Sequence, residues 1–215
     1  MVKDFMCEPK WTAKSLLKNR SNDEIKNEPM LFSCDVDAAI DLGGPLTKEF
    51  VEKLLAEYGE GPWIFDSRVH MLMPGWYPCI PGWHHDDVPR NGYNGQPDYE
   101  NMNYKSEHVM AIVDNGTWSL TEFVKDFVCD LSDVGHGEMT YGKWSRDIQR
   151  MNPRKVTVPN QTLVYFTWED FHRGQPATGS GWRWFIRASK NTDRKPMNEV
   201  RKQVQVYMSN LDAGW

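Results

Sequence analysis

The segment over residues 182–189 constrains the fold most, because apolar side chains alternate in it with a set that includes two arginines. Successive side chains of a β-strand point to opposite faces, so a strand here would have two unlike faces. One face would carry Arg183, Phe185 and Arg187. The other would carry Trp182, Trp184, Ile186 and Ala188. An arginine on an inward face needs an anion, because an unpaired buried charge is costly. The segment therefore predicts a strand that covers a core and brings positive charge into a pocket.

The residues before this strand predict a turn that follows a histidine. His172 comes after the apolar run 162–166, and Gly174, Pro176, Gly179 and Gly181 then favour a change of direction. We expect a hairpin that brings a neutral imidazole and a fixed positive charge into one pocket. The alternative is a surface hairpin whose arginines are solvated.

The rest of the chain also favours short strands joined by turns. Its 215 residues include 10 Trp, 9 Phe, 8 Tyr, 13 Pro and 16 Gly. Aromatic residues are enriched in strands, whereas proline and glycine punctuate them with turns. This length is ordinary for one all-β domain. We therefore expect a mainly β fold in a single domain.

Charge and cysteine usage exclude several classes of protein. The net charge of −5 argues against a general affinity for nucleic acid. Cysteines 7, 34, 79 and 129 are widely separated, which favours reduced thiols over disulfides or a zinc site. The first ten residues contain no apolar signal core, and no run approaches membrane-spanning length. We expect a soluble, cytoplasmic protein without a membrane partner.

Elements before the central region include one helix and one strand. Pro45 and Thr47 indicate the start of a helix over 47–58, which has one apolar stripe and ends near Gly59. Residues 63–73 predict a half-buried strand in which Asp66, Arg68 and His70 alternate with Phe65, Ser67, Val69 and Met71. His70 is expected to be a face residue rather than a ligand. Residues 1–30 are expected to form an outer arm or a short helix.

Later elements alternate strands with polar segments. Residues 108–113 and 117–124 predict a hairpin around Asn115-Gly116. Residues 156–158 and 162–166 predict two further strands, and Val204, Val206 and Met208 predict a last edge strand. The polar loop 91–105 has the length of a functional lid. The second half of 135–151 predicts a short helix.

The run His84-His85-Asp86-Asp87 carries the clearest chemical signal. Residues two apart on a strand point the same way, so an H-x-D pair can contact one ion. Two imidazoles and one carboxylate suit a divalent metal such as Fe(II), and His172 could supply the third ligand from a neighbouring strand. We favour His84 with Asp86, because that register places Trp83 and His85 together on the opposite face. His85 with Asp87 remains the alternative. His108 and His136 are expected to be structural or exposed.

The order H84-x-D86, H172, R183 resembles the H-x-D…H…R pattern of the Fe(II)- and 2-oxoglutarate-dependent oxygenases. The segments H-R-G-Q-P-A at 172–177 and G-W-R-W-F-I-R at 181–187 also resemble that family. The resemblance covers residues 63–189. It implies a double-stranded β-helix, or cupin-like jelly roll, with flanking helices. We expect an N-terminal arm over 1–45, a catalytic jelly-roll core over 63–189 and a C-terminal edge extension over 190–215.

The resemblance also implies a function. Fe(II) would be held by His84, Asp86 and His172, and the far carboxylate of 2-oxoglutarate would be bound by Arg183, with Arg187 as the alternative. The enzyme would be a dioxygenase that oxidises its substrate, most simply by hydroxylation, and releases succinate and CO2. A small molecule, a nucleotide and a peptidyl side chain all remain open as substrate. Residues that could contact it are Trp76, Trp83, Arg90, Tyr93, Tyr99 and Tyr104.

Two other classes of protein remain. A cupin-type metal protein that is not an oxygenase would share the scaffold but would need no arginine for a dicarboxylate. In a tryptophan-rich binding module, neither iron nor 2-oxoglutarate would change the melting temperature. A helical phosphohydrolase built on the H-D pair is excluded, because Pro78, Pro81 and Gly82 are incompatible with a helix there.

Overall fold

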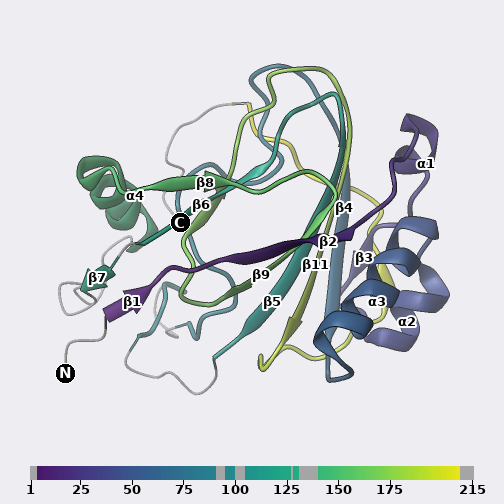
Figure 1. Cartoon of the computed structure of the whole chain (residues 1–215), viewed down its shortest axis with the longest axis horizontal. Helices are drawn as coiled ribbons and strands as arrows, with labels where there is room; N and C mark the ends of the chain where they lie inside the picture. The colour runs from purple at the N-terminus through teal and green to yellow at the C-terminus, as the bar shows by residue number, and fades with distance from the viewer. Residues whose placement is uncertain (1–3, 91–94, 100–104, 127, 131–139, 209–215) are drawn as a thin grey trace.

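The fold is built mainly from antiparallel β-sheets with few helices (Figure 1). A computed structural model describes residues 4–90, 95–99, 105–126, 128–130 and 140–208. The largest sheet has the order β2-β9-β5-β11-β4, with strands β2 (Lys10–Leu16), β4 (Ile64–Leu72), β5 (Glu107–Asn115), β9 (Thr162–Thr167) and β11 (Gly181–Lys190). A second sheet has the order β10-β6-β8, with strands β6 (Thr121–Val124), β8 (Lys155–Thr157) and β10 (His172–Gly174). The described strands do not close into a barrel.

Smaller elements flank the two sheets. Strand β1 (Asp4–Met6) pairs with β7 (Val128–Asp130), and β3 (Leu31–Phe32) pairs with β12 (Glu199–Val200). The helices are α1 (Asn22–Lys26), α2 (Val36–Leu42), α3 (Pro45–Tyr58) and α4 (Thr140–Met151). Within the described ranges, no helix combines the length and the apolar character needed to cross a membrane.

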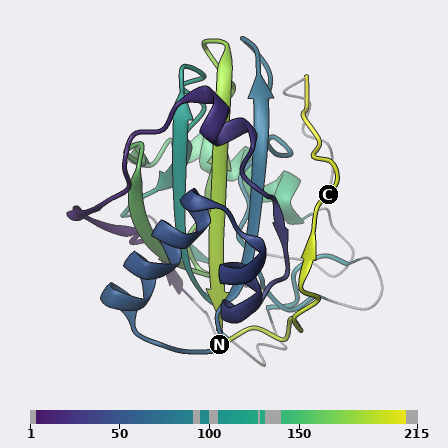
Figure 2. The ribbon, with the colours of Figure 1, turned by 90° about the vertical axis from the view of Figure 1, so that its right-hand side faces the viewer.

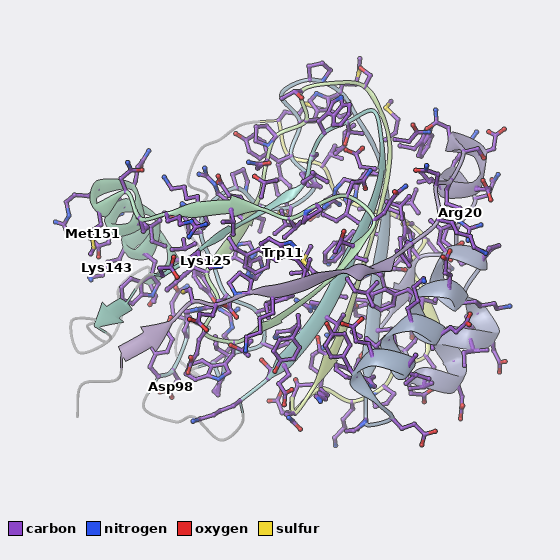
Figure 3. All side chains as sticks on the ribbon, in the orientation of Figure 1. Trp11, Arg20, Asp98, Lys125, Lys143 and Met151 are labelled. Atoms are coloured by element: carbon purple, nitrogen blue, oxygen red, sulfur yellow. The ribbon has the colours of Figure 1, made fainter. Side chains whose placement is uncertain are left out.

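The predicted two-faced strand is confirmed in β11. Trp184, Ile186 and Ala188 are fully buried in a core that α1, α2 and α3 cover. Figure 2 shows these helices lying over one face of the large sheet. The opposite face packs toward the second sheet through Met110, Ile112, Phe123, Val158, Val164 and Phe166. Trp11 of β2, labelled in Figure 3, packs against this inner core. The alternation therefore separates a helix-covered core from an inner face that carries the arginines.

The predicted alternation of β4 places further polar side chains on the inner face. In the antiparallel pair of β4 and β11, Arg183 lies opposite His70, Phe185 opposite Arg68, and Arg187 opposite Asp66. Side chains of directly opposite residues point to the same face of a sheet. Asp66, Arg68 and His70 therefore share the inner face with the two arginines of β11.

Both predicted hairpins are wrong, because each predicted partner joins the other sheet. Strand β10 pairs with β6, whereas β11 pairs with β4 and β5. Likewise, β6 pairs with β10 and β8 rather than with β5. The turn at Gly116 and Trp118, both with positive φ, carries the chain away from β5. The segment before β11 packs against this turn, where the N–H groups of Thr178 and Gly179 donate to the carbonyl of Thr117. Local turn residues predicted a change of direction but not the strand to which the chain returned.

The chain ends also differ from expectation. Residues 10–16, expected in an arm or short helix, form the edge strand β2, because their backbone pairs with β9. The only helix found in the described part of 1–30 is the short α1. The predicted edge strand around Val204, Val206 and Met208 is wrong. That segment makes one isolated bridge, between Tyr77 and Tyr207, and otherwise lines a cavity.

Helix α3 begins close to the predicted residue and is capped by a residue from the segment between α1 and β3. Gly44 is its N-cap and has no side chain to accept a hydrogen bond. The buried carboxylate of Glu28 accepts instead from the N–H groups of Gly44 (3.0 Å), Leu46 (3.2 Å) and Thr47 (2.8 Å), and from the Thr47 hydroxyl (2.6 Å). Glu28 therefore satisfies donors that every helix start leaves open. Gly59 ends the helix with a φ of 76°.

Replacing Glu28 with alanine is expected to lower the free energy of unfolding by about 2–4 kcal/mol, because several buried donors lose their acceptor. Urea denaturation measures this change. Glu52→Ala, an exposed change on the same helix, is the control and should stay within about 0.5 kcal/mol of the parent. A Glu28→Ala loss as small as that of the control would contradict the capping role.

Candidate metal centre

Backbone pairing places the two histidines of the predicted ligand group, His84 and His172, side by side. His84 lies outside the named strands, but it forms an isolated antiparallel bridge with His172 of β10. The N–H of His84 donates to the carbonyl of His172 at 3.0 Å, and the reverse bond is 2.9 Å. Opposite residues of such a pair point to the same side. The two imidazole centroids are accordingly 4.6 Å apart.

Asp86 completes a group of three potential ligands with these histidines. One ligand atom from each of His84, Asp86 and His172 lies within 4.8 Å of the others. Nε2 of His172 is 3.3 Å from Oδ2 of Asp86. The H-x-D pair, His84 and Asp86, and the later histidine, His172, are therefore close enough to bind one metal ion.

The hydrogen bonds of the two imidazoles suit metal coordination. Nδ1 of His84 lies 3.1 Å from the carbonyl of Gly82, and Nδ1 of His172 lies 3.0 Å from the carbonyl of Asp170. A neutral imidazole that donates from Nδ1 presents its lone pair on Nε2, which is the usual arrangement in metal sites. Burial, with the neighbouring His172, lowers the pKa of His84 to about 4. His84 therefore stays neutral and able to bind a metal near neutral pH.

His85 lies away from this group. Its ring is buried, stacks on Phe171 with centroids 4.3 Å apart and hydrogen-bonds the hydroxyl of Tyr99. The carboxylate of Asp87 instead lies 3.7 Å from Nη1 of Arg194. His84 and Asp86, rather than His85 and Asp87, therefore lie together with His172 in the candidate group.

Arg187 pairs with the candidate metal ligand Asp86. Its Nη1 contacts Oδ2 of Asp86, and its Nη2 lies 4.0 Å from Oδ2 of Asp87. Despite burial, the positive charge of Arg187 holds the pKa of Asp86 well below its usual range. Asp86 is therefore kept ionised and oriented, which is a positioning role for Arg187.

Replacing Arg187 with methionine is expected to weaken Mn(II) binding by about 10–100-fold, because partners that orient a ligand typically have effects of that size. Isothermal titration calorimetry measures the change. Arg194→Met is the matched control, since Arg194 pairs with Asp66 and Asp87 but not with Asp86. Equal losses in the two variants would show that the specific pair with Asp86 has no role.

Arg183 lies in a cavity that also reaches the three candidate ligands. This cavity measures about 100 Å³ and is lined by both arginines of β11, the three candidate ligands and the side chains Met110, Thr121, Phe166 and Phe185, among others. Nε of Arg183 donates to the carbonyl of Ser119 at 2.6 Å. The guanidinium forms no ion pair with any carboxylate in the described part of the chain, and burial lowers its pKa to about 10. The charge remains available for an anion in the cavity.

Sequence reasoning missed His70 and Arg68 as cavity residues. Both line the cavity from β4. The carbonyls of Pro78 and Gln205 lie near the His70 ring, but neither ring nitrogen makes a hydrogen bond of ordinary geometry. Burial and the charge of Arg183 lower the pKa of His70 to about 3. The alternation of β4 contained the signal, because it had already placed both residues on one face.

His108 is structural, as expected. It is buried between the hydroxyls of Ser106 (3.0 Å) and Ser189 (2.9 Å). Ser106 in turn donates to the backbone carbonyl of Asp87 at 3.0 Å. This chain of contacts ties the H-x-D segment to β5 and β11. His136 lies outside the described residues.

Several other predicted contact residues have packing roles. Trp83 and Tyr99 are buried, and Tyr99 accepts a hydrogen bond from Nε1 of Trp144 at 3.1 Å. Trp76 is partly exposed. Tyr93 and Tyr104 lie outside the described residues, as does much of the predicted loop 91–105.

Cys7, Cys34 and Cys79 are free thiols, as predicted.

No protein-family model matches this chain, and no curated protein sequence matches it. Among solved structures, AviO1 from Streptomyces viridochromogenes Tue57 is similar at 14% identity, with 86% of this chain and 76% of that chain covered and a TM-score of 0.39. A nickel complex of the non-heme monooxygenase ThoJ is similar at 11% identity, with 90% and 85% covered and a TM-score of 0.33. Both TM-scores lie below 0.5, so these likenesses do not establish a shared fold.

Proposed function

We propose that this chain is an Fe(II)- and 2-oxoglutarate-dependent dioxygenase built on a jelly-roll scaffold. The observation that carries the proposal is that one cavity contains both the His84–Asp86–His172 group and the unpaired charge of Arg183. A metal site alone would not require a buried guanidinium nearby. The combination suits a ligand that chelates a metal at one end and has a carboxylate at the other.

The donor set fits Fe(II). Two neutral imidazoles and one ionised carboxylate on one side of an ion leave positions open on the other side, as in non-heme iron oxygenases. Asp86 is ionised and held by Arg187, and each imidazole has a backbone carbonyl at Nδ1. His84, Asp86 and His172 would therefore hold the ion with little rearrangement.

Arg183 is our choice for the far carboxylate of 2-oxoglutarate. Arg187, the other candidate, already pairs with Asp86, whereas the hydrogen bond of Arg183 within the described ranges goes to a neutral acceptor, the carbonyl of Ser119. The planar guanidinium of Arg183 can bind a carboxylate through two parallel hydrogen bonds. Phe166, Phe185 and Met110 line the same cavity and would limit access of water.

Bound iron and 2-oxoglutarate would supply the oxidising chemistry, in which dioxygen is consumed, 2-oxoglutarate is converted to succinate and CO2, and the substrate is oxidised. The residues of this chain orient the metal ligands, fix the cosubstrate and exclude water. The two facing antiparallel sheets, with a core between them, support the jelly-roll assignment. A cytoplasmic location and a single domain stay predictions.

Replacing Arg183 with methionine is expected to lower the affinity for 2-oxoglutarate by about 100-fold, because a bidentate charge-assisted pair is lost. Anaerobic titration of the Fe(II)-loaded protein, followed by its visible charge-transfer absorption, measures this affinity. Arg154→Met removes an exposed arginine and serves as the control. If Arg183→Met binds 2-oxoglutarate as tightly as the parent, Arg183 does not have this role.

The same titration separates the rival classes. A cupin-type metal protein that is not an oxygenase would bind the metal without responding to 2-oxoglutarate. A tryptophan-rich binding module would respond to neither. Within the described ranges of this chain, five tryptophans are buried and cannot form a recognition surface: Trp63, Trp83, Trp144, Trp168 and Trp184.

A further inference from the structure

We propose that a second, larger cavity beside the candidate metal centre binds an oxyanion of the substrate, a carboxylate or a phosphate group, through Arg68. The inference deepens the proposed function, because it assigns this cavity to the substrate of the same site. The anion site itself rests on separate residues and can be tested without metal.

The larger cavity is strongly cationic. It measures about 500 Å³ and reaches both His84 and Asp86. Among the described residues, its lining includes one carboxylate, that of Asp86. It also includes four arginines: Arg68, Arg90, Arg187 and Arg201. The other lining side chains include the neutral polar Tyr141, Gln203, Gln205 and Tyr207. Such a lining favours a polar, negatively charged ligand over an apolar one.

Most of these arginines already have partners. Arg187 pairs with Asp86, and Arg201 donates to Oδ1 of Asp66 at 2.8 Å. Arg90 donates to the carbonyl of Gly95 at 3.1 Å and lies over the ring of Tyr141. Asp66 and Asp86 are therefore engaged by Arg201 and Arg187.

Arg68 has no such partner. Its guanidinium makes no hydrogen bond or ion pair with another residue in the part of the chain that the structure describes. Its cross-strand neighbours on β11 include Phe185, directly opposite it, rather than a carboxylate. Burial and repulsion from Arg201 and Arg187 outweigh the attraction of Asp66 and Asp86 and lower the pKa of Arg68. A charge held among like charges at a cavity wall is costly unless an anion joins it.

The position of Arg68 connects the two cavities. Arg68 lines both, whereas Arg183 lines only the smaller one. An oxyanion on Arg68 in the larger cavity would leave the smaller cavity to a ligand of Arg183. It would also hold its molecule beside the candidate metal ligands. This arrangement suits a substrate anchored by its anionic group.

Thermal unfolding of the metal-free protein with added inorganic phosphate or sodium acetate, at constant ionic strength, tests the anion site. At ten times the dissociation constant, the anion that fits should raise the Tm by about 3–6 °C. The two salts distinguish a phosphate from a carboxylate. The increase should fall to about 1 °C or less in Arg68→Met and persist in Arg154→Met. Without an added anion, Arg68→Met should be at least as stable as the parent, because it removes an unpaired charge.

The second arm uses Mn(II)-loaded protein saturated with N-oxalylglycine, which would occupy the Arg183 cavity. Bound phosphate should then show paramagnetic broadening of its ³¹P resonance, and Arg68→Met should abolish this broadening. An equal Tm increase in parent and Arg68→Met, or no increase in the parent with either salt, would overturn the proposal. If the protein binds no Mn(II), the proposed function fails, but the metal-free arm still decides whether Arg68 binds an anion.

Discussion

Replacing His172 with alanine is expected to weaken Mn(II) binding by more than about 100-fold. Removing a residue that only orients a metal ligand typically lowers the metal affinity by about 10–100-fold, and His172 would be a ligand itself. Its ring lies 3.3 Å from the Asp86 carboxylate and faces His84 across a backbone bridge. Turnover of 2-oxoglutarate should be lost together with the metal. Isothermal titration calorimetry with Mn(II) provides the direct measurement.

His85→Ala is the matched control for this experiment. His85 is adjacent to His84 in the sequence, but it stacks on Phe171 and hydrogen-bonds Tyr99. We expect His85→Ala to lower the melting temperature while the metal affinity stays close to that of the parent. If His172→Ala binds Mn(II) normally, or if only His85→Ala loses it, the assignment of ligands is wrong.

The second large effect is a steep loss of stability in mild acid. Among the described residues of the metal-free protein, four histidines have lowered pKa values: the partly buried His84 at about 4, and the buried His70 at about 3 and His85 and His108 well below their usual value. Burial is the first cause in each. In the unfolded chain these groups take up protons near pH 6.5. As the pH falls below 6.5, protons therefore favour the unfolded state, and stability is lost.

Asp170 acts in the opposite direction. Burial raises its pKa to about 6, so between pH 6 and 4 the folded state takes up a proton that the unfolded state does not. Four histidines less this one carboxyl leave three net protons, which correspond to about 4 kcal/mol per pH unit. Because domains of ordinary stability have about 5–15 kcal/mol in total, we expect unfolding between about pH 6 and 4.

Circular dichroism and urea denaturation across this pH range measure the effect. His70→Leu removes one of the four groups without breaking a hydrogen bond of ordinary geometry. Because one proton fewer is taken up on unfolding, the unfolding free energy of this variant should fall by about 1.4 kcal/mol less per pH unit than that of the parent. A parent protein whose stability is unchanged from pH 6.5 to 5 would contradict neutral burial of these histidines.

Local pattern predicted much of the site. The two-residue alternation placed Arg68 and His70 on one face of β4, and Arg183 and Arg187 on one face of β11, because side-chain direction in a strand follows from the backbone alone. The same argument favoured His84 and Asp86 over His85 and Asp87 as candidate ligands. Helix α3 was also predictable, since its apolar stripe and Gly59 are local signals.

Strand pairing was not predictable in the same way. Strands β6 and β10 join the second sheet, and β2 adds to the edge of the first, through backbone hydrogen bonds that nearly any sequence can make. For that reason the predicted hairpins and the last edge strand were wrong. The cap that Glu28 provides for α3 likewise depends on a residue 16 positions before the N-cap Gly44.

Residue order and alternation were enough to favour His84, Asp86 and His172 as a candidate ligand group and to place Arg183 and Arg187 on one face of β11, because these depend on spacing within short segments. The folded chain alone decided that Arg187 pairs with Asp86, that Arg183 meets no carboxylate among the described residues, and that Arg68 stands between two cavities. The partner of a charged side chain depends on which strands and loops lie around it in the folded chain. Spacing along one strand does not determine which other segments these are.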